Sequence, residues 1–443
     1  MLSDPRGVPV TAANAESAAR LEATIGAYCV FHKETGDRLK EALTGDPNLV
    51  MAHLLRGYFM LMLVKRELLP RAQQAAEAAD KAMLEVGSTP REALHRQALA
   101  AWIARDETKA IAILRRILAD YPRDLVALKL VQYLLFYSGD WVAMRDVVSR
   151  ALDTWDEALP GYGFALGCHA FGLEECGDYA AAERAGRRAV EINPQDIWGA
   201  HAVAHVCEMQ DRIEDGLAWI DGHAAHWSAT NNFAFHVWWH RCLFLMAQRR
   251  FDETLARYDR EVRAESTDEY LDITNAVALL WRLEQQGVDV GKRWDELAAR
   301  ASARATEHMM SFGDAHYAMA LAAAGKDGDF ERWLVSARAY AAAGRETQAA
   351  VLGTVGLALG EAALAHRKGD YARALERLLP VRDAIRRIGG SHAQRDLFAQ
   401  LLIDAAVKSG RRGVAIELLN ERLSLRPRNV WGLAERDLVG TQA

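Results

Sequence analysis

Prolines recur along this chain at a spacing close to 34 residues. Between them the apolar residues recur every three or four positions, which is the period of a helix, and strand-length runs of β-branched residues are absent. A proline cannot continue a helix, so regularly spaced prolines separate successive helical units. The sequence therefore predicts an all-α fold of stacked helix pairs. The prolines in question are Pro47, Pro90, Pro122, Pro160 and Pro194, at intervals of 43, 32, 38 and 34 residues.

Short motifs mark the turns between the helical units and the turns inside each unit. The units open with residues that can cap the next helix, in Asp46-Pro-Asn, Tyr121-Pro-Arg-Asp, Asn193-Pro-Gln-Asp and Arg426-Pro-Arg-Asn. Inside the units a Gly-Asp-aromatic step ends one helix and begins the next, at Gly139-Asp-Trp, Gly177-Asp-Tyr, Gly328-Asp-Phe and Gly369-Asp-Tyr, with a looser version at Arg250-Phe-Asp. We expect a right-handed α-solenoid, a superhelix of about ten to twelve tetratricopeptide-like helix–turn–helix repeats. No flexible linker divides it, so residues 1–443 are predicted to form a single continuous array.

The composition limits the location and the partners of the protein. There are 54 basic and 60 acidic residues, a net charge of −6, which argues against a nucleic-acid partner. No run of about 18 apolar residues indicates a membrane helix, and the first residues lack the pattern of a secretory signal. The five cysteines form no C-x-x-C pair, so we expect reduced, mostly buried thiols. These features predict a cytoplasmic protein without a membrane partner; they carry no signal for the oligomeric state.

Histidines cluster in one part of the chain. Six of the 14 lie between residues 201 and 240, and four of these form two pairs at a spacing of four residues, His201/His205 and His236/His240. Residues four apart share one face of a helix, so each pair presents two imidazoles side by side.

The repeat pattern assigns both pairs to first helices of neighbouring units. One first helix is predicted over residues 197–209 and also carries Glu208; the next is predicted over residues 232–248 and also carries Trp239. First helices line the concave face of a repeat array, where ligands usually bind. We therefore expect both pairs in the wall of one channel.

Five stretches carry a resemblance to a known family: Ile192–Met209, Gly222–Trp227, His236–His240, Asp272–Glu284 and Phe312–His316. They contain motifs such as Gly222-His-Ala-Ala-His-Trp and His236-Val-Trp-Trp-His. In these residues the chain resembles the tetratricopeptide repeat protein 38 family, most densely over residues 160–320. The resemblance implies a helical repeat superhelix but brings no established reaction, so the function has to be argued from the site.

Two explanations of the histidines compete. Imidazoles are common transition-metal ligands, and two His-x-x-x-His pairs on neighbouring helices could hold one ion such as zinc. The pattern is not the H-E-x-x-H of zinc proteases, because Ala202 replaces the glutamate. Structural histidines, hydrogen-bonded among Trp, Tyr and Asp, are favoured. No cofactor is therefore predicted, with a metal at His201, His205, His236 and His240 as the alternative.

An acid–base site without a metal is the other catalytic hypothesis. It would combine His205 or His240 with a carboxylate from Glu208, Asp272 or Asp314, because a carboxylate orients an imidazole and raises its basicity. His316, from the stretch Phe312–His316, belongs to the same group of candidates. No nucleophile elbow, phosphate-binding loop or redox motif accompanies these residues.

We predict a binding protein that holds a small molecule or peptide in a channel lined by His, Trp and acidic residues. An enzyme that uses the four-histidine cluster with carboxylates, by acid–base or metal-dependent hydrolysis, is the alternative. The predicted ligand-binding residues are His201, His205, Glu208, His236, Trp239, His240, Asp272 and His316. Near the C-terminus Arg411, Arg412, Arg422, Arg426 and Arg428 are interpreted as a solvated basic face, with an acidic partner as the alternative.

Overall fold

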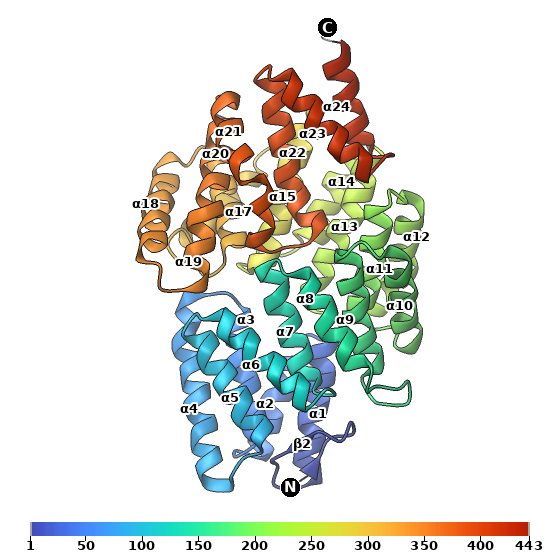
Figure 1. The fold of residues 1–443 in the computed structure, drawn as a ribbon, viewed down its shortest axis with the longest axis vertical. Helices are drawn as coiled ribbons and strands as arrows, with labels where there is room; N and C mark the ends of the chain where they lie inside the picture. Colours follow the sequence, from blue (N-terminus) through green and yellow to red (C-terminus); the bar gives the residue numbers. More distant parts are fainter. Residues whose placement is uncertain (1, 442–443) are drawn as a thin grey trace. The chain divides into compact units, whose positions relative to one another are not determined.

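The computed structural model describes residues 2–441, and most of them lie in helices (Figure 1). Two strands of two residues, β1 (Leu2–Ser3) and β2 (Pro9–Val10), form an antiparallel hairpin with Leu2 opposite Val10. A single bridge between His32 and Thr230 is the only other strand pairing over residues 2–441. The prediction of an all-α chain is confirmed.

The chain folds as two compact units. One comprises Met1–Val203 and His223–Ala234, and the other comprises Ala204–Gly222 and Phe235–Ala443. The divisions fall inside two continuous helices, α11 (Ile197–Met209) and α13 (Phe233–Ala247). The single array and the right-handed superhelix stay predictions.

Consecutive helices of the first unit pack against each other in pairs, as α3 does on α4, α5 on α6 and α9 on α10. After the hairpin this unit contains α1 (Ala15–Cys29), α2 (Thr35–Gly45), α3 (Val50–Met62), η1 (Arg66–Leu68), α4 (Leu69–Val86), α5 (Pro90–Ile103), α6 (Glu107–Asp120), α7 (Leu125–Ser138), α8 (Trp141–Leu152), α9 (Tyr162–Glu175), α10 (Tyr179–Ile192) and the short η2 (Ala224–Trp227).

The second unit repeats this arrangement, with α20 on α21, α22 on α23 and α23 on α24. Besides the parts of α11 and α13 that belong to it, it contains α12 (Ile213–His223), α14 (Phe251–Arg257), η3 (Tyr258–Val262), α15 (Tyr270–Gln285), α16 (Arg293–Ala303), α17 (Ser311–Ala323), α18 (Asp327–Ala343), α19 (Thr347–Val351), η4 (Leu352–Gly356), α20 (Leu357–Arg367), α21 (Tyr371–Leu378), η5 (Leu379–Ile388), α22 (His392–Lys408), α23 (Arg412–Leu425) and α24 (Val430–Thr441).

The Gly-Asp-aromatic turns are found where expected, with one exception. Gly139, Gly177 and Gly369 take left-handed backbone angles, with φ of 70°, 81° and 77°, directly after a first helix. The step predicted at Gly328 is wrong, because that residue lies inside α18. The turn uses Gly325 instead, with φ of 64°. A glycine can end a helix at either of these two positions, which are three residues apart. The helix α17 ends at the first of them.

Side-chain caps begin the helices that follow the proline motifs. Asp124 accepts a hydrogen bond from the N–H of Ala127, Asp196 from that of Gly199, and Asn429 from that of Gly432. Each bond satisfies one of the N–H groups that a helix start leaves without a partner. The polar residues of these three openings act as predicted. The first opening does not, because α3 begins after Leu49 and has no side-chain cap.

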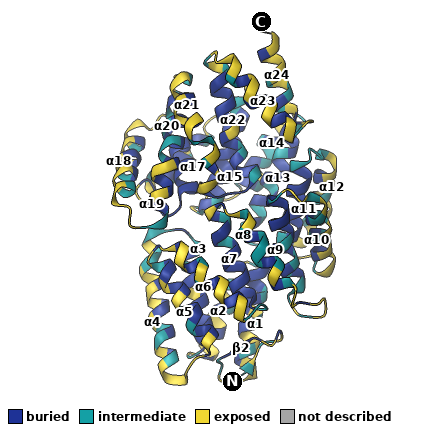
Figure 2. Cartoon of the chain, viewed as in Figure 1, coloured by how far each residue is buried: buried dark blue, intermediate teal, exposed yellow. Residues whose placement is uncertain are grey.

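Small residues allow close approach between helices. Ala182 and Ala189 of α10 are fully buried, as is Ala170 of α9. Buried and exposed positions alternate at helical spacing along the pairs (Figure 2). Gly186 of α10 lies equally close to its neighbour, since a Cβ there would lie 3.1 Å from the carbonyl oxygen of Gly199. The glycine thus lets α10 approach the start of α11.

One helical stretch meets the length and composition of a membrane span. Thr347–Arg367, which covers α19, η4 and α20, has a mean hydropathy of 1.4 over its most apolar window. The prediction that no such segment exists is corrected here. Polar residues interrupt the apolar run, so no unbroken run is seen in the sequence, but the mean hydropathy of the window stays high. Since 61% of that window is buried inside the structure, the stretch has the environment of a core helix.

Candidate functional site

Helix α11 carries the first histidine pair. Asp196 caps this helix through Gly199, and the helix extends over Ile197–Met209, the range predicted from the sequence. His201 and His205 lie one turn apart on it and are 2% and 0% exposed, so neither lines an open surface. His201 contacts the rings of Phe171, Trp198 and Phe233, with centroids 5.1–5.4 Å away.

Helix α13 carries the second pair and begins one residue after the predicted position. His236 is 4% exposed and His240 is fully buried. Trp239 stacks on His236, with ring centroids 5.4 Å apart and planes inclined by 14°. The tryptophan therefore forms part of the packing around the histidines.

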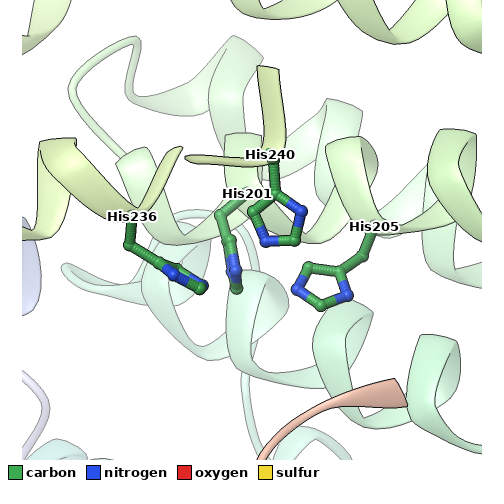
Figure 3. A group of neighbouring side chains, drawn as sticks. All are labelled: His201, His205, His236 and His240. Atoms are coloured by element: carbon green, nitrogen blue, oxygen red, sulfur yellow. The ribbon is translucent and has the colours of Figure 1, made fainter. Parts of the chain in front are cut away.

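The four imidazoles form one compact group, which we call the histidine cluster: His201, His205, His236 and His240. One ring nitrogen from each can be chosen so that all four lie within 4.8 Å of one another. The ring centroids of His205 and His240 are 4.3 Å apart, and those of His236 and His240 are 4.8 Å apart. Figure 3 shows the four rings gathered between the two helices that carry them. The geometry brings the two pairs together, and their place in the wall of a channel stays a prediction.

Two hydrogen bonds orient the rings of the second pair. Nδ1 of His240 lies 2.8 Å from Oε2 of Glu208, and Nδ1 of His236 lies 3.0 Å from Oδ1 of Asn275. An amide oxygen and an ionised carboxylate accept only, so each Nδ1 carries the hydrogen and donates it. In the neutral form of each ring the Nε2 atom then carries the lone pair.

Burial keeps two of these rings neutral. It lowers the pKa of His205 well below the usual value, because the charged form loses hydration, and the neighbouring His240 adds to the effect. The pKa of His236 falls for the same two reasons, although the hydrogen bond with Asn275 acts in the opposite direction. Neutral imidazoles are hydrogen-bond acceptors and metal ligands, not cations.

The other predicted site residues lie outside the cluster. Asp272 accepts a hydrogen bond of 2.5 Å from the hydroxyl of Thr267. Asp314 accepts one of 2.8 Å from Nδ1 of His308, and His316 donates from Nδ1 to the carbonyl oxygen of Phe312. Their neighbours in the fold therefore differ from those of the four histidines.

A pocket of about 350 Å³ lies within the second unit. The histidines do not line it, although Glu208 does. Its wall also includes apolar side chains and amides from α13, α15, α22 and α24, among them Leu243, Phe244, Met246, Gln285, Gln400 and Trp431. A pocket of this size with mixed lining is typical of small-molecule sites.

Five arginines and four acidic residues line this pocket, and the sequence analysis did not connect the arginines with a ligand site. Arg422 is 9% exposed and pairs with Asp396 at 3.0 Å through Nη2. Arg426 pairs with Asp211 at 2.7 Å, across 215 residues of sequence. The interpretation of these two arginines as a solvated face is wrong, because both pair with acids that lie elsewhere in the second unit, Asp396 on α22 and Asp211 between α11 and α12. No local sequence motif predicts such pairs.

Arg282 differs from Arg422 and Arg426 in having no acidic partner among the described residues. It is 3% exposed, and its guanidinium donates to the main-chain carbonyls of Ala278 and Ala393. No salt bridge is formed by Arg282 within residues 2–441, and its charge lies 5.6 Å from the ring centre of Trp239. Burial lowers its pKa to about 10, although Asp396 and Glu208 act in the opposite direction.

The chain has weak similarity to known helical proteins. No model of a known protein family matches its sequence. Among solved structures it is similar to Naa15/Naa10 bound to HypK-THB, with 14% identity and a TM-score of 0.26; the match covers 94% of this chain and 65% of that one. It is similar to the human IFIT1 dimer with m7Gppp-AAAA, with 13% identity, a TM-score of 0.37, and 89% and 90% covered. It is also similar to yeast Tom70, with 12% identity, a TM-score of 0.32, and 96% and 89% covered.

Proposed function

We propose that this helical-repeat protein binds a small anionic molecule in the pocket of its second unit. The observation that carries the proposal is Arg282, a buried cation on the pocket wall whose described hydrogen bonds go to neutral carbonyl groups. A carboxylate or phosphate in the pocket would supply the missing opposite charge. Arginine suits this role because its planar fork can bind either group through two parallel hydrogen bonds.

The charges around the pocket support an acidic ligand. Arg422 and Arg426 are already neutralised by Asp396 and Asp211, so a ligand would not need to compete for them. Arg282 has no such partner, and a buried charge without one costs free energy. Binding an anion next to it removes part of that cost, which makes the pocket selective for negative charge.

The neutral part of the wall supports a ligand with an apolar body. Leu243, Phe244 and Met246 of α13 and Trp431 of α24 form much of the lining. We infer a small acid with an apolar portion in preference to a peptide, because the pocket is about 350 Å³ in volume.

Catalysis is the second candidate, and one contact favours it. Glu208 lines the pocket and also accepts the hydrogen of His240. A buried carboxylate–imidazole pair next to a pocket could exchange a proton with a bound molecule. In this hypothesis Glu208 and His240 would be the acid–base residues.

The proposal also includes the family of the protein and its location in the cell. Membership of the tetratricopeptide repeat protein 38 family is supported by the five stretches quoted above. A cytoplasmic location is supported by five cysteines that are all free thiols, four of them buried.

Affinity capture from a metabolite extract tests the proposal. Full-length protein without an affinity tag is incubated with the extract and desalted, and the retained small molecules are identified by mass spectrometry. We expect a stoichiometric anion on the wild type and at least a tenfold loss with Arg282→Met. Arg373→Met, which removes an exposed arginine of the same unit, is the control and should retain the ligand.

The same experiment separates binding from catalysis. A ligand retained unchanged supports the binding protein, whereas consumption that is lost with Glu208→Gln supports the enzyme. Retention of no anion by the wild type, or equal retention by Arg282→Met, would contradict the proposed pocket function.

A further inference from the structure

The histidine cluster has the composition and spacing of a metal site. We propose that His201, His205, His236 and His240 together bind one divalent transition-metal ion of the zinc type. This site is separate from the pocket, because none of the four side chains lines it. The proposal does not depend on the identity of the ligand discussed above.

The distances suit a single ion. A tetrahedral ion with metal–nitrogen bonds of about 2.1 Å holds its ligand nitrogens roughly 3.4 Å apart. The four ring nitrogens lie within 4.8 Å of one another, so small side-chain rotations bring them to that separation. Both pairs come from stable helices, whose spacing of four residues places each pair on one face.

The hydrogen bonds of the second pair are those of metal-bound histidines. Such histidines usually donate their other ring N–H to a carboxylate or carbonyl oxygen, which fixes the ring and the free lone pair. His240 donates from Nδ1 to Glu208 and His236 donates from Nδ1 to Asn275. The Nε2 atoms of both rings are thereby assigned as ligands, and Glu208 adds a negative charge near the ion.

Burial and the type of ligand favour a transition-metal ion at this point. Water has little access, since none of the four residues is more than 4% exposed. Four nitrogen ligands without a thiolate suit zinc and its neighbours cobalt, nickel and copper. A closed set of four protein ligands is typical of a structural ion, which here would tie α11 to α13.

Metal analysis of the full-length protein, expressed without an affinity tag, tests the site directly. After dialysis against zinc and then against metal-free buffer, we expect about one equivalent of zinc per chain. His205→Gln and His240→Gln should each lower this to below a tenth of an equivalent. His316→Gln removes an equally buried histidine outside the cluster and should retain the ion.

A cobalt titration tests the site on the wild type alone, so it does not require that the variants fold. Cobalt added to metal-free wild type should produce visible ligand-field bands that saturate at one equivalent, without the intense charge-transfer band of thiolate ligands. Bands that do not saturate, or zinc retention below a tenth of an equivalent by the wild type, would overturn the proposal. Equal zinc retention by folded His205→Gln and His240→Gln would also overturn it.

Discussion

At the scale of single residues, two aspartates in the same repeat motif have opposite electrostatics. Asp124 and Asp196 both follow a proline motif and both cap a first helix. Asp124 pairs with Arg91 and with His95, each at 2.8 Å. Asp196 is 1% exposed, and its Oδ2 atom has no hydrogen-bond partner among the described residues. The motif therefore fixes the cap but not the charge balance around it.

Asp196→Asn should stabilise the protein at neutral pH. Burial raises the pKa of Asp196 to about 6, above its value near 3.9 in an unfolded chain. The native state therefore favours the protonated form, and this stabilisation is lost as the pH rises through 6. Asparagine keeps the capping oxygen without the charge, so we expect a gain of up to about 3 kcal/mol at pH 8. Urea unfolding at pH 8 measures it, and the gain should shrink towards pH 4.

Asp124→Asn should have the opposite effect. Burial alone would raise the pKa of Asp124, but Arg91 and His95 hold it well below its usual range. The charged form is therefore the stabilising one, and its contribution is present above about pH 4 and decreases as the pH falls further. Removing one partner of a buried pair costs about 3–5 kcal/mol. Urea unfolding at pH 7 should show this loss, and a loss below 1 kcal/mol would contradict the assigned pairing.

At the scale of helices, close packing depends on particular glycines. A Cβ on Gly172 of α9 would lie 2.9 Å from the Cα of Arg145 in α8, where only backbone movement could relieve the overlap. A Cβ on Gly26 of α1 would meet no atom within 4 Å. A substitution by alanine should therefore change the free energy of unfolding in opposite directions at the two positions.

Gly172→Ala should lower the free energy of unfolding by about 1–3 kcal/mol, the usual cost of overpacking. Gly26→Ala should raise it by about 0.5–1 kcal/mol, because alanine restricts the unfolded chain and favours a helix. Chemical denaturation of both variants beside the wild type measures the difference. Equal effects at both positions would show that α8 and α9 are not packed as closely as described.

The sequence predicted those elements that depend on local signals. The range of α11 followed from its cap and from the apolar period, and the spacing of the histidines placed each pair on one helix face. The turn at Gly328 failed because Gly325 offered the same signal. Asp272, Asp314 and His316 were grouped with the cluster because of their residue types, but Thr267, His308 and Phe312 are their described partners.

At the scale of the molecule, the pocket could not be predicted because its residues meet only through tertiary packing. Arg426 and Asp211 are 215 residues apart, and Arg282 donates to a carbonyl 111 residues away. No periodicity or motif connects such positions. Only the folded second unit shows that Arg422 and Arg426 are buried beside acids.

The two compact units should unfold separately, since each has its own packed helices. Gly172→Ala perturbs the first unit, as argued above. Gly360→Ala is the matched change in the second unit, where a Cβ would lie 2.6 Å from Cζ3 of Trp333 and 3.0 Å from the Cβ of Ala318. Each substitution destabilises the helices around it, and separate units confine that effect.

Hydrogen exchange measured by mass spectrometry locates the effect. Gly172→Ala should speed exchange in α7–α10 and leave α17–α23 unchanged, and Gly360→Ala should do the reverse. Urea unfolding should show two transitions, with one shifted in each variant. Faster exchange throughout residues 2–441 in both variants would mean that the chain unfolds as one cooperative body, as a single continuous array with strong coupling between neighbours would.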